Sequence, residues 1–261
     1  MAQAWPLKRV GLRVQDLEGS IKYYQQLGFV IVRDQRAEGT VGMGVGETEI
    51  LTLRHTPEAR PRAPHTAGLY HFAILLPSDT DLGSFLRHSV QGDGVRIDGA
   101  SDHLVSQALY LNDPEGNGIE VYADRPREQW PMNESTGTPR MDTLRLKAQD
   151  LLAKAGEFHG FPEGTILGHM HLNVSDLDES IAYYEQTFGL NLMANLYHQA
   201  GFVSWDGYHH HLGLNTWTGP NAARHEEDVA GIDFFELARP ELQPGTYTDP
   251  NGVRIVVSTN A

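Results

Sequence analysis

Three side chains of the kind that bind metal ions lie in related parts of this sequence. His71 and His169 each lie near the start of an expected strand, and Glu120 lies on the last strand of its repeat unit. Because the chain has no cysteine, a metal would be held by imidazoles and carboxylates. Two histidines and one carboxylate bind Fe(II) and leave coordination positions open. The competing interpretation is that each histidine is an ordinary polar residue on a half-buried sheet.

An internal duplication relates the parts of the chain that carry these residues. Of the 16 positions from 9 to 24, 8 are identical to the residues 160 positions later. The identical residues are Leu12, Val14, Asp16, Leu17, Ser20, Ile21, Tyr23 and Tyr24, which match Leu172, Val174, Asp176, Leu177, Ser180, Ile181, Tyr183 and Tyr184. Matches of this number at one offset indicate repeat units that share a fold.

Four such units account for most of the chain. They occupy residues 7–55, 69–124, 166–218 and 229–258. The order of strand-like and helix-like periodicity in the first three units predicts βαβββ modules. The fourth module is abbreviated, because its first strand and its final turn are too close in sequence to allow a helix of normal length. The predicted fold class is α+β, with curled mixed sheets that form a cup around a metal.

The order along the chain groups the modules into two predicted domains. Residues 1–125 would hold the N-terminal pair of modules and residues 166–261 the C-terminal pair. The connection over residues 126–165 predicts one helix, which Asp142 would cap and whose apolar face would include Leu144.

Alignment of the modules predicts which of them hold the metal. The residue that opens the first strand is, in turn, Arg9, His71, His169 and Asp233. On the last strand, the position of Glu120 in the second module is Val256 in the fourth. The second and third modules therefore offer two histidines and one carboxylate, and alternation along the strands would turn them into the cup. A contribution from the fourth module stays open.

The overall charge argues against two classes of partner. The formal net charge is −14, which disfavours nucleic acid and an anionic membrane surface.

The first residues lack the apolar stretch of a secretory signal, and no run of 18 apolar residues occurs. We therefore expect a cytoplasmic protein with no membrane partner.

Several motifs resemble those of a known family. Two of them are Gly168-His169-Met170-His171-Leu172-Asn173-Val174-Ser175-Asp176 and Asp113-Pro114-Glu115-Gly116-Asn117-Gly118-Ile119-Glu120. Together with the four-module architecture, they resemble the vicinal oxygen chelate superfamily, which includes the glyoxalases. A closer similarity, to extradiol ring-cleaving dioxygenases of the bacillus catechol-2,3-dioxygenase type, is carried by Gly68-Leu69-Tyr70-His71-Phe72-Ala73-Ile74-Leu75-Leu76-Pro77 and Gly207-Tyr208-His209-His210-His211. The resemblance covers most of residues 7–258.

The resemblance implies roles for individual residues. It gives a non-haem Fe(II) centre, with Mn(II) as the alternative metal, and the ligands His71, His169 and Glu120. His210 corresponds to the acid–base histidine of these enzymes, and Tyr110 to a tyrosine ten positions before the glutamate ligand. A further active-site histidine of the family falls at Ser101, so the nearby His103 would replace it. Alternation predicts that His210 points to one face and its two neighbours to the other.

Such an enzyme would open a catechol ring beside its two hydroxyl groups. O₂ would be the second substrate, and the product would be of the 2-hydroxymuconic-semialdehyde type. Phe72, Trp205 and Trp217 are candidate walls for the ring. Two alternatives remain, a metal-dependent glyoxalase-like lyase or isomerase and a metal-free small-molecule binding protein of the same fold. The sequence leaves open which catechol is preferred, which metal is bound and whether the chain forms a homo-oligomer.

Overall fold

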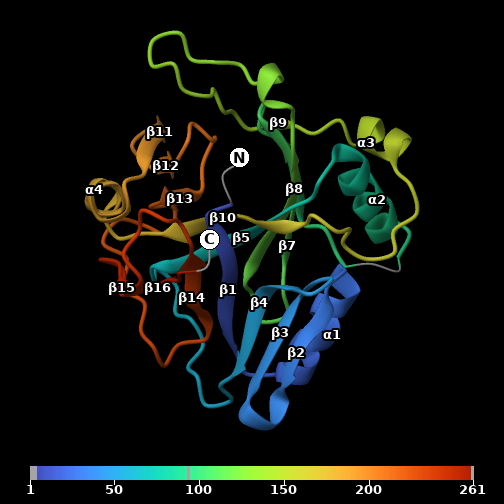
Figure 1. The fold of residues 1–261 in the computed structure, drawn as a ribbon, viewed down its shortest axis with the longest axis vertical. Helices are drawn as coiled ribbons and strands as arrows, with labels where there is room; N and C mark the ends of the chain where they lie inside the picture. The colour runs from blue at the N-terminus through green and yellow to red at the C-terminus, as the bar shows by residue number, and fades with distance from the viewer. Residues whose placement is uncertain (1–4, 93–94, 260–261) are drawn as a thin grey trace.

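The expected modules form in the computed structural model, which describes residues 5–92 and 95–259 (Figure 1). The first module consists of β1 (Leu7–Val14), α1 (Leu17–Leu27), β2 (Val30–Gln35), the short 3₁₀ helix η1 (Arg36–Glu38), β3 (Thr40–Val45) and β4 (Thr48–His55). The second consists of β5 (Gly68–Leu75), α2 (Asp79–Val90), β6 (Gly99–Asp102), β7 (Ser106–Asn112) and β8 (Gly118–Asp124). The third consists of β10 (Ile166–Asn173), α4 (Leu177–Phe188), β11 (Asn191–Leu196), β12 (Ala200–Ser204) and β13 (Leu212–Asn215). The fourth has only the strands β14 (Gly231–Leu237), β15 (Gly245–Thr248) and β16 (Arg254–Val257).

The local sequence explains where the helices begin and end. Asp16 and Asp176 cap α1 and α4, since each side chain accepts a hydrogen bond from the backbone N–H three residues later. Gly28 and Gly189 follow these helices with φ values of 127° and 71°, which residues with a Cβ rarely adopt. The side chains that α1 buries recur at helical spacing and are Leu17, Ser20, Ile21, Tyr24 and Leu27.

Each of the two mixed sheets combines two modules. One has the order β15-β16-β14-β1-β4-β3-β2 and combines the fourth module with the first. The other has the order β11-β12-β13-β10-β5-β8-β7-β6-β9 and combines the third with the second. In this larger sheet β10 and β5 pair antiparallel, so that the first strands of the second and third modules lie side by side (Figure 1). One continuous core contains apolar side chains of both sheets, among them Leu12, Phe72 and Leu172.

Equivalent hydrogen bonds also connect modules that follow one another in the chain. The buried Tyr24 hydroxyl donates to Asp113, and its repeat equivalent Tyr184 donates to Asp249. The helix of the first module is thereby tied to the final turn of the second, and the helix of the third to the final turn of the fourth. The division into domains 1–125 and 166–261 follows these contacts, whereas the sheets cut across it, so the division stays a prediction.

The connection between the second and third modules differs from the expectation. It holds the short 3₁₀ helix η2 (Arg127–Gln129), β9 (Leu144–Arg145) and α3 (Ala148–Lys154), and α3 lies beside α2 (Figure 1). The prediction that Asp142 caps the helix, with Leu144 on its apolar face, was wrong. Leu144 pairs with Asp102 and is 45% exposed. The open edge of β6 offers partners to backbone groups of this segment, and pairing there satisfies them outside a helix.

The positions of two short strands were not identified from the sequence. β6 and β15 have 4 residues each and bury none of them fully, so neither shows the apolar alternation that predicts a strand. The fourth module otherwise follows the prediction, because its described residues contain no helix. In the described part of the chain, no helix has both the length and the apolar content needed to cross a membrane.

Candidate metal centre

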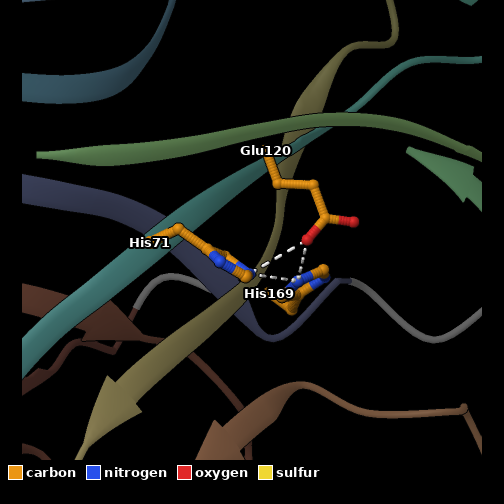
Figure 2. Close-up of side chains that lie close together, drawn as sticks. All are labelled: His71, Glu120 and His169. Carbon is orange, nitrogen blue, oxygen red and sulfur yellow. Dashed lines mark hydrogen bonds and ion pairs between the residues drawn. The ribbon is translucent and has the colours of Figure 1, made fainter. Parts of the chain in front are cut away.

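Three neighbouring strands, β5, β8 and β10, bring His71, Glu120 and His169 together (Figure 2). Nε2 of His71 lies 2.9 Å, and Nε2 of His169 3.2 Å, from Oε2 of Glu120. The two Nε2 atoms are 3.3 Å apart. All three residues are buried, with exposed fractions of 5% or less. Among the described residues, this is the one group of three or more His, Asp or Glu side chains whose ligand atoms all lie within 4.8 Å of one another.

The register of the larger sheet explains this convergence. Ala73 of β5 pairs with Glu120 of β8 on one side and with His169 of β10 on the other. His71 lies two residues before Ala73 and therefore extends from the same face of the sheet. The small alanine side chain leaves the space above it to the three larger side chains, which point toward one another (Figure 2).

Two β-bulges between β5 and β10 flank the group. Gly168, just before His169, has no partner in the register of β5. Tyr70, just before His71, has no partner in the register of β10. An extra residue of this kind bends its strand and redirects the neighbouring side chains. As a result Tyr70 and His71 line the same cavity, although strict alternation would place them on opposite faces.

Close packing behind His169 requires glycine at position 168. A Cβ atom there would lie 2.1 Å from the hydroxyl oxygen of Tyr122. Tyr122 is fully buried, and its hydroxyl lies 2.9 Å from that of Tyr208, so the ring has no free space into which to move. The glycine of the Gly-His-x-His motif is therefore explained by the approach of Tyr122 to the backbone.

Burial and mutual interaction set the charges of the group. Burial would raise the pKa of Glu120, but interactions with His169 and His71 outweigh it and hold the pKa well below its ordinary value. Burial lowers the pKa of His169 to about 4, although Glu120 opposes this shift. At neutral pH the group thus combines an ionised carboxylate with a neutral imidazole, the forms in which these side chains bind metals.

A cavity of about 280 Å³ is lined by two members of the group, His71 and Glu120. Aromatic rings form much of its wall, and they belong to Tyr70, Tyr110, Phe202 and Trp217. The connection closes one side with residues 141–143. None of the described residues that line the cavity is a lysine or an arginine.

Tyr110 and His103 form a hydrogen-bonded pair in the cavity wall. The Tyr110 hydroxyl lies 2.6 Å from Nε2 of His103, and Nδ1 of His103 lies 2.8 Å from the backbone oxygen of Asp142. Because a carbonyl oxygen only accepts, Nδ1 of His103 carries a hydrogen. Tyr110 also pairs with Glu120 across β7 and β8, and burial together with the charge of Glu120 raises the pKa of Tyr110. His103 and Ser101 therefore both line the cavity that Tyr110 also lines.

His210 lines the same cavity, and its ring centroid lies 4.2 Å from that of His169. The prediction that its neighbours point to the opposite face was wrong for His209. β13 begins only at Leu212, so residues 209–211 are not part of a strand and do not alternate. The side chains of His209 and His210 meet instead, with their Nδ1 atoms 2.8 Å apart. His211 bonds to Ser204 away from this pair.

One cavity residue was assigned no catalytic role from the sequence, and two of the suggested aromatic walls lie elsewhere. His171 is buried and lines the cavity, and its Nε2 has no hydrogen-bond partner among the described residues. Alternation from His169 is the signal that places it there. Of the three aromatic walls suggested from the sequence, Trp217 lines the cavity. Phe72 lies in the core because it alternates with His71, and Trp205 borders a different cavity.

The smaller sheet carries ion pairs where the larger sheet carries the metal-binding group. Arg9 and Asp233 stand at the repeat positions of the two histidines. The buried Asp233 lies 3.0 Å from Nη1 of Arg13 and 2.6 Å from Nη2 of Arg254. An arginine keeps its proton and offers no lone pair to a metal. The candidate centre therefore belongs to the second and third modules.

Comparison with known proteins agrees with this architecture. The family model of the Glyoxalase/Bleomycin resistance protein/Dioxygenase superfamily matches residues 7–121 and 166–243. The chain is 41% identical over 240 residues to the catechol-2,3-dioxygenase of Bacillus subtilis (strain 168), and the match covers 89% of this chain and 82% of that protein.

Two solved structures share the fold at low sequence identity. A putative dioxygenase from Bacillus subtilis subsp. subtilis str. 168 superposes with a TM-score of 0.62 at 12% identity, covering 98% of this chain and 86% of that one. Glyoxalase I from Zea mays gives a TM-score of 0.59 at 17% identity, covering 97% and 91%. The fold, the extent of the family match and the 41% identical relative lead to one conclusion: this chain belongs to the Glyoxalase/Bleomycin resistance protein/Dioxygenase superfamily.

Proposed function

We propose that the protein is an extradiol dioxygenase, which uses O₂ to open the ring of a catechol beside its two hydroxyl groups. The observation that carries the proposal is the convergence of His71, His169 and Glu120 beside an aromatic-lined cavity, whose wall includes His71 and Glu120. Similarity to a protein named catechol-2,3-dioxygenase supports it. The product would be of the 2-hydroxymuconic-semialdehyde type.

The three residues fit a divalent metal. Two imidazole nitrogens and one carboxylate oxygen converge at 2.9 to 3.3 Å in a buried place, where such atoms are costly unless they share a cation. The donor set is the one that binds non-haem Fe(II), with Mn(II) as the alternative. When bound, the metal would supply the redox chemistry that lets O₂ react with an aromatic diol.

The other cavity residues would bind the substrate and move its protons. His210, beside His169, would take a proton from a catechol hydroxyl and later return it, which is a task suited to imidazole. The Tyr110 hydroxyl, held by His103, would orient a substrate oxygen. The aromatic rings at the wall would exclude water from the ring and pack against its faces.

The cavity favours a small catechol without an anionic substituent. Its volume of about 280 Å³ is near the lower end of the range for ligand pockets, about 300 to 1,000 Å³. A carboxylate on the ring would find Glu120 and Asp142 in the lining but no lysine or arginine among the described residues there. We therefore expect catechol and its alkyl derivatives to be better substrates than protocatechuate.

The test begins with metal-free protein that is loaded with Fe(II) without oxygen and then given catechol and air. Uptake of one O₂ per catechol, with the yellow ring-fission product, would support the proposal. If the protein holds iron but consumes no O₂ with any of several catechols, the proposed dioxygenase activity is wrong, whereas the proposed metal site is supported. A glyoxalase-like enzyme would instead act on a hemithioacetal, and a binding protein would retain the catechol unchanged.

A variant tests the metal ligands separately. Glu120→Gln should lower the iron content to about a tenth of the wild-type value or less, because it removes the only carboxylate of the group. Glu157→Gln, which changes an exposed glutamate, is the matched control and should retain iron. Unchanged iron in Glu120→Gln would show that the ligand set is wrong.

A further inference from the structure

A chain of hydrogen bonds leads from the cavity to Asp124, the last residue of β8. Nδ1 of His210 lies 2.8 Å from Nδ1 of His209, and Nε2 of His209 lies 3.0 Å from Oδ1 of Asp124. His210 lines the candidate metal cavity, whereas Asp124 borders two different cavities. We propose that Asp124 is a positioning residue, which acts through His209 to hold His210 as the tautomer with hydrogen on Nδ1 and a free lone pair on Nε2.

The direction of each hydrogen bond follows from what the atoms can donate. A carboxylate only accepts, so Nε2 of His209 carries the hydrogen that faces Asp124. In a neutral imidazole the other nitrogen is then an acceptor, so Nδ1 of His209 accepts from Nδ1–H of His210. His210 is left with Nε2 as the ring nitrogen that can accept a hydrogen bond or a proton from a molecule in the cavity.

The surroundings hold Asp124 and His209 in place. Oδ2 of Asp124 accepts from the hydroxyl of Tyr208 at 2.9 Å, so each carboxylate oxygen has its own donor. Tyr208 in turn accepts from Tyr122, whose hydroxyl lies 2.9 Å away. The side chain of His209 is only 1% exposed, and its ring centroid lies 4.0 Å from that of Tyr208. A ring packed in this way cannot turn over without breaking both of its hydrogen bonds.

The hydrogen bond between His209 and His210 requires that these two residues, which precede β13, lie outside a strand. In a strand, residues 209 and 210 would point to opposite faces and could not bond to each other. Outside a strand, the His210 imidazole lines the cavity while Nδ1 of His209 bonds to Nδ1 of His210. The segment therefore supplies both the group that meets the substrate and the group that fixes its tautomer.

The role of His210 in turnover rests on the proposed function, whereas the hydrogen-bond chain can be measured without turnover. The experiment uses Zn(II)-loaded protein with ¹⁵N-labelled histidine, in which long-range ¹H–¹⁵N spectra show which ring nitrogen carries hydrogen. We expect His210 to carry it on Nδ1 in the wild type. In Asp124→Asn a substantial part of His210 should carry it on Nε2, because a carboxamide can donate as well as accept.

Two further variants make the test sharper. His209→Phe keeps a ring against Tyr208 but interrupts the chain, and it should change the tautomer of His210 in the same direction. Asp206→Asn is the matched control, since Asp206 borders the same cavity as Asp124 but pairs with Arg239. It should leave the His210 spectrum as in the wild type.

Activity of the Fe(II)-loaded protein gives a second readout. In serine proteases, replacing the aspartate that is hydrogen-bonded to the catalytic histidine lowers kcat by about 10⁴. For Asp124→Asn we expect kcat to fall by at least about tenfold, while KM and the iron content change little. The kcat of the double variant, Asp124→Asn with His209→Phe, should be no lower than that of His209→Phe alone, because both substitutions interrupt the same chain of hydrogen bonds.

The outcomes separate the inference from the proposed function. An Nε2–H tautomer in the wild type, or an unchanged tautomer in Asp124→Asn, would overturn the inference even if catechol is cleaved. The expected tautomers without any ring cleavage would sustain the hydrogen-bond chain and overturn only the proposed function.

Discussion

His169 should make the stability of the metal-free protein fall as the pH drops from 7 to 5. Its imidazole is buried, with a pKa lowered to about 4 from the ordinary value of 6.5. On acidification the unfolded chain binds a proton at this residue near pH 6.5, whereas the folded chain does so only near pH 4. The unfolded state therefore binds more protons in this window, and the free energy of unfolding decreases as the pH falls.

The size of the effect follows from the two pKa values. Between pH 7 and pH 5, His169 alone should remove about 2 kcal/mol from the free energy of unfolding. Burial also lowers the pKa values of His171 and His210, which add to the total loss. Glu120 contributes little in this window, because its pKa lies well below its ordinary value of 4.5; its stabilising charge is lost only at more acidic pH.

Guanidinium unfolding of the chelator-treated protein at pH 7 and pH 5 measures this loss. His169→Gln removes the titrating ring, so its loss should be smaller than that of the wild type by about 2 kcal/mol. His159→Gln changes a histidine that is 76% exposed and should lose as much as the wild type. If His169→Gln loses the same free energy as the wild type, His169 is not held neutral by burial in the folded protein.

Three other predictions concern packing, the repeat and the substrate. Gly168→Ala should lower the free energy of unfolding by about 1 to 3 kcal/mol, since its Cβ would lie 2.1 Å from the hydroxyl oxygen of Tyr122; stability equal to the wild type would mean that the backbone moves freely at the bulge. Tyr24→Phe should cost about 1 to 2 kcal/mol in the same unfolding assay, because Asp113 loses a buried donor, and no loss would mean that the bond contributes nothing. Protocatechuate should show a kcat/KM at least about tenfold below that of catechol, since a ring carboxylate gains no cationic partner; equal values in an oxygen-uptake assay would contradict the substrate preference.

The sequence by itself determined the modules and the residues of the candidate centre. Aspartate caps and terminal glycines marked α1 and α4, because capping depends on hydrogen bonds between residues only three positions apart. The duplication then placed His71 and His169 at equivalent positions of two strands. Since equivalent strands of repeated modules adopt equivalent directions, a local pattern predicted a contact between residues far apart in the chain.

Tertiary structure decided how these residues meet. The ligand positions had indicated that the second and third modules combine, but the pairing of the fourth module with the first depends on which strand edges come together, and no local pattern encodes that choice. The bulges at Gly168 and Tyr70 are irregularities in the pairing of β5 with β10, so they depend on two strands that are far apart in the sequence. The predicted helix start at Asp142 failed for a similar reason, since a sheet edge supplied hydrogen bonds to that segment.

The histidines at positions 209 and 210 show the same limit most clearly. Their spacing suggested opposite faces of a strand, and this followed correctly from the period of a strand. Whether a strand extends to these residues is decided by the partners of its backbone, and the hydrogen bonds to β10 and β12 begin at His211, after both residues. The sequence thus determined which side chains are present near the centre, while the extent of the sheet decided that two adjacent imidazoles bond to each other and reach Asp124.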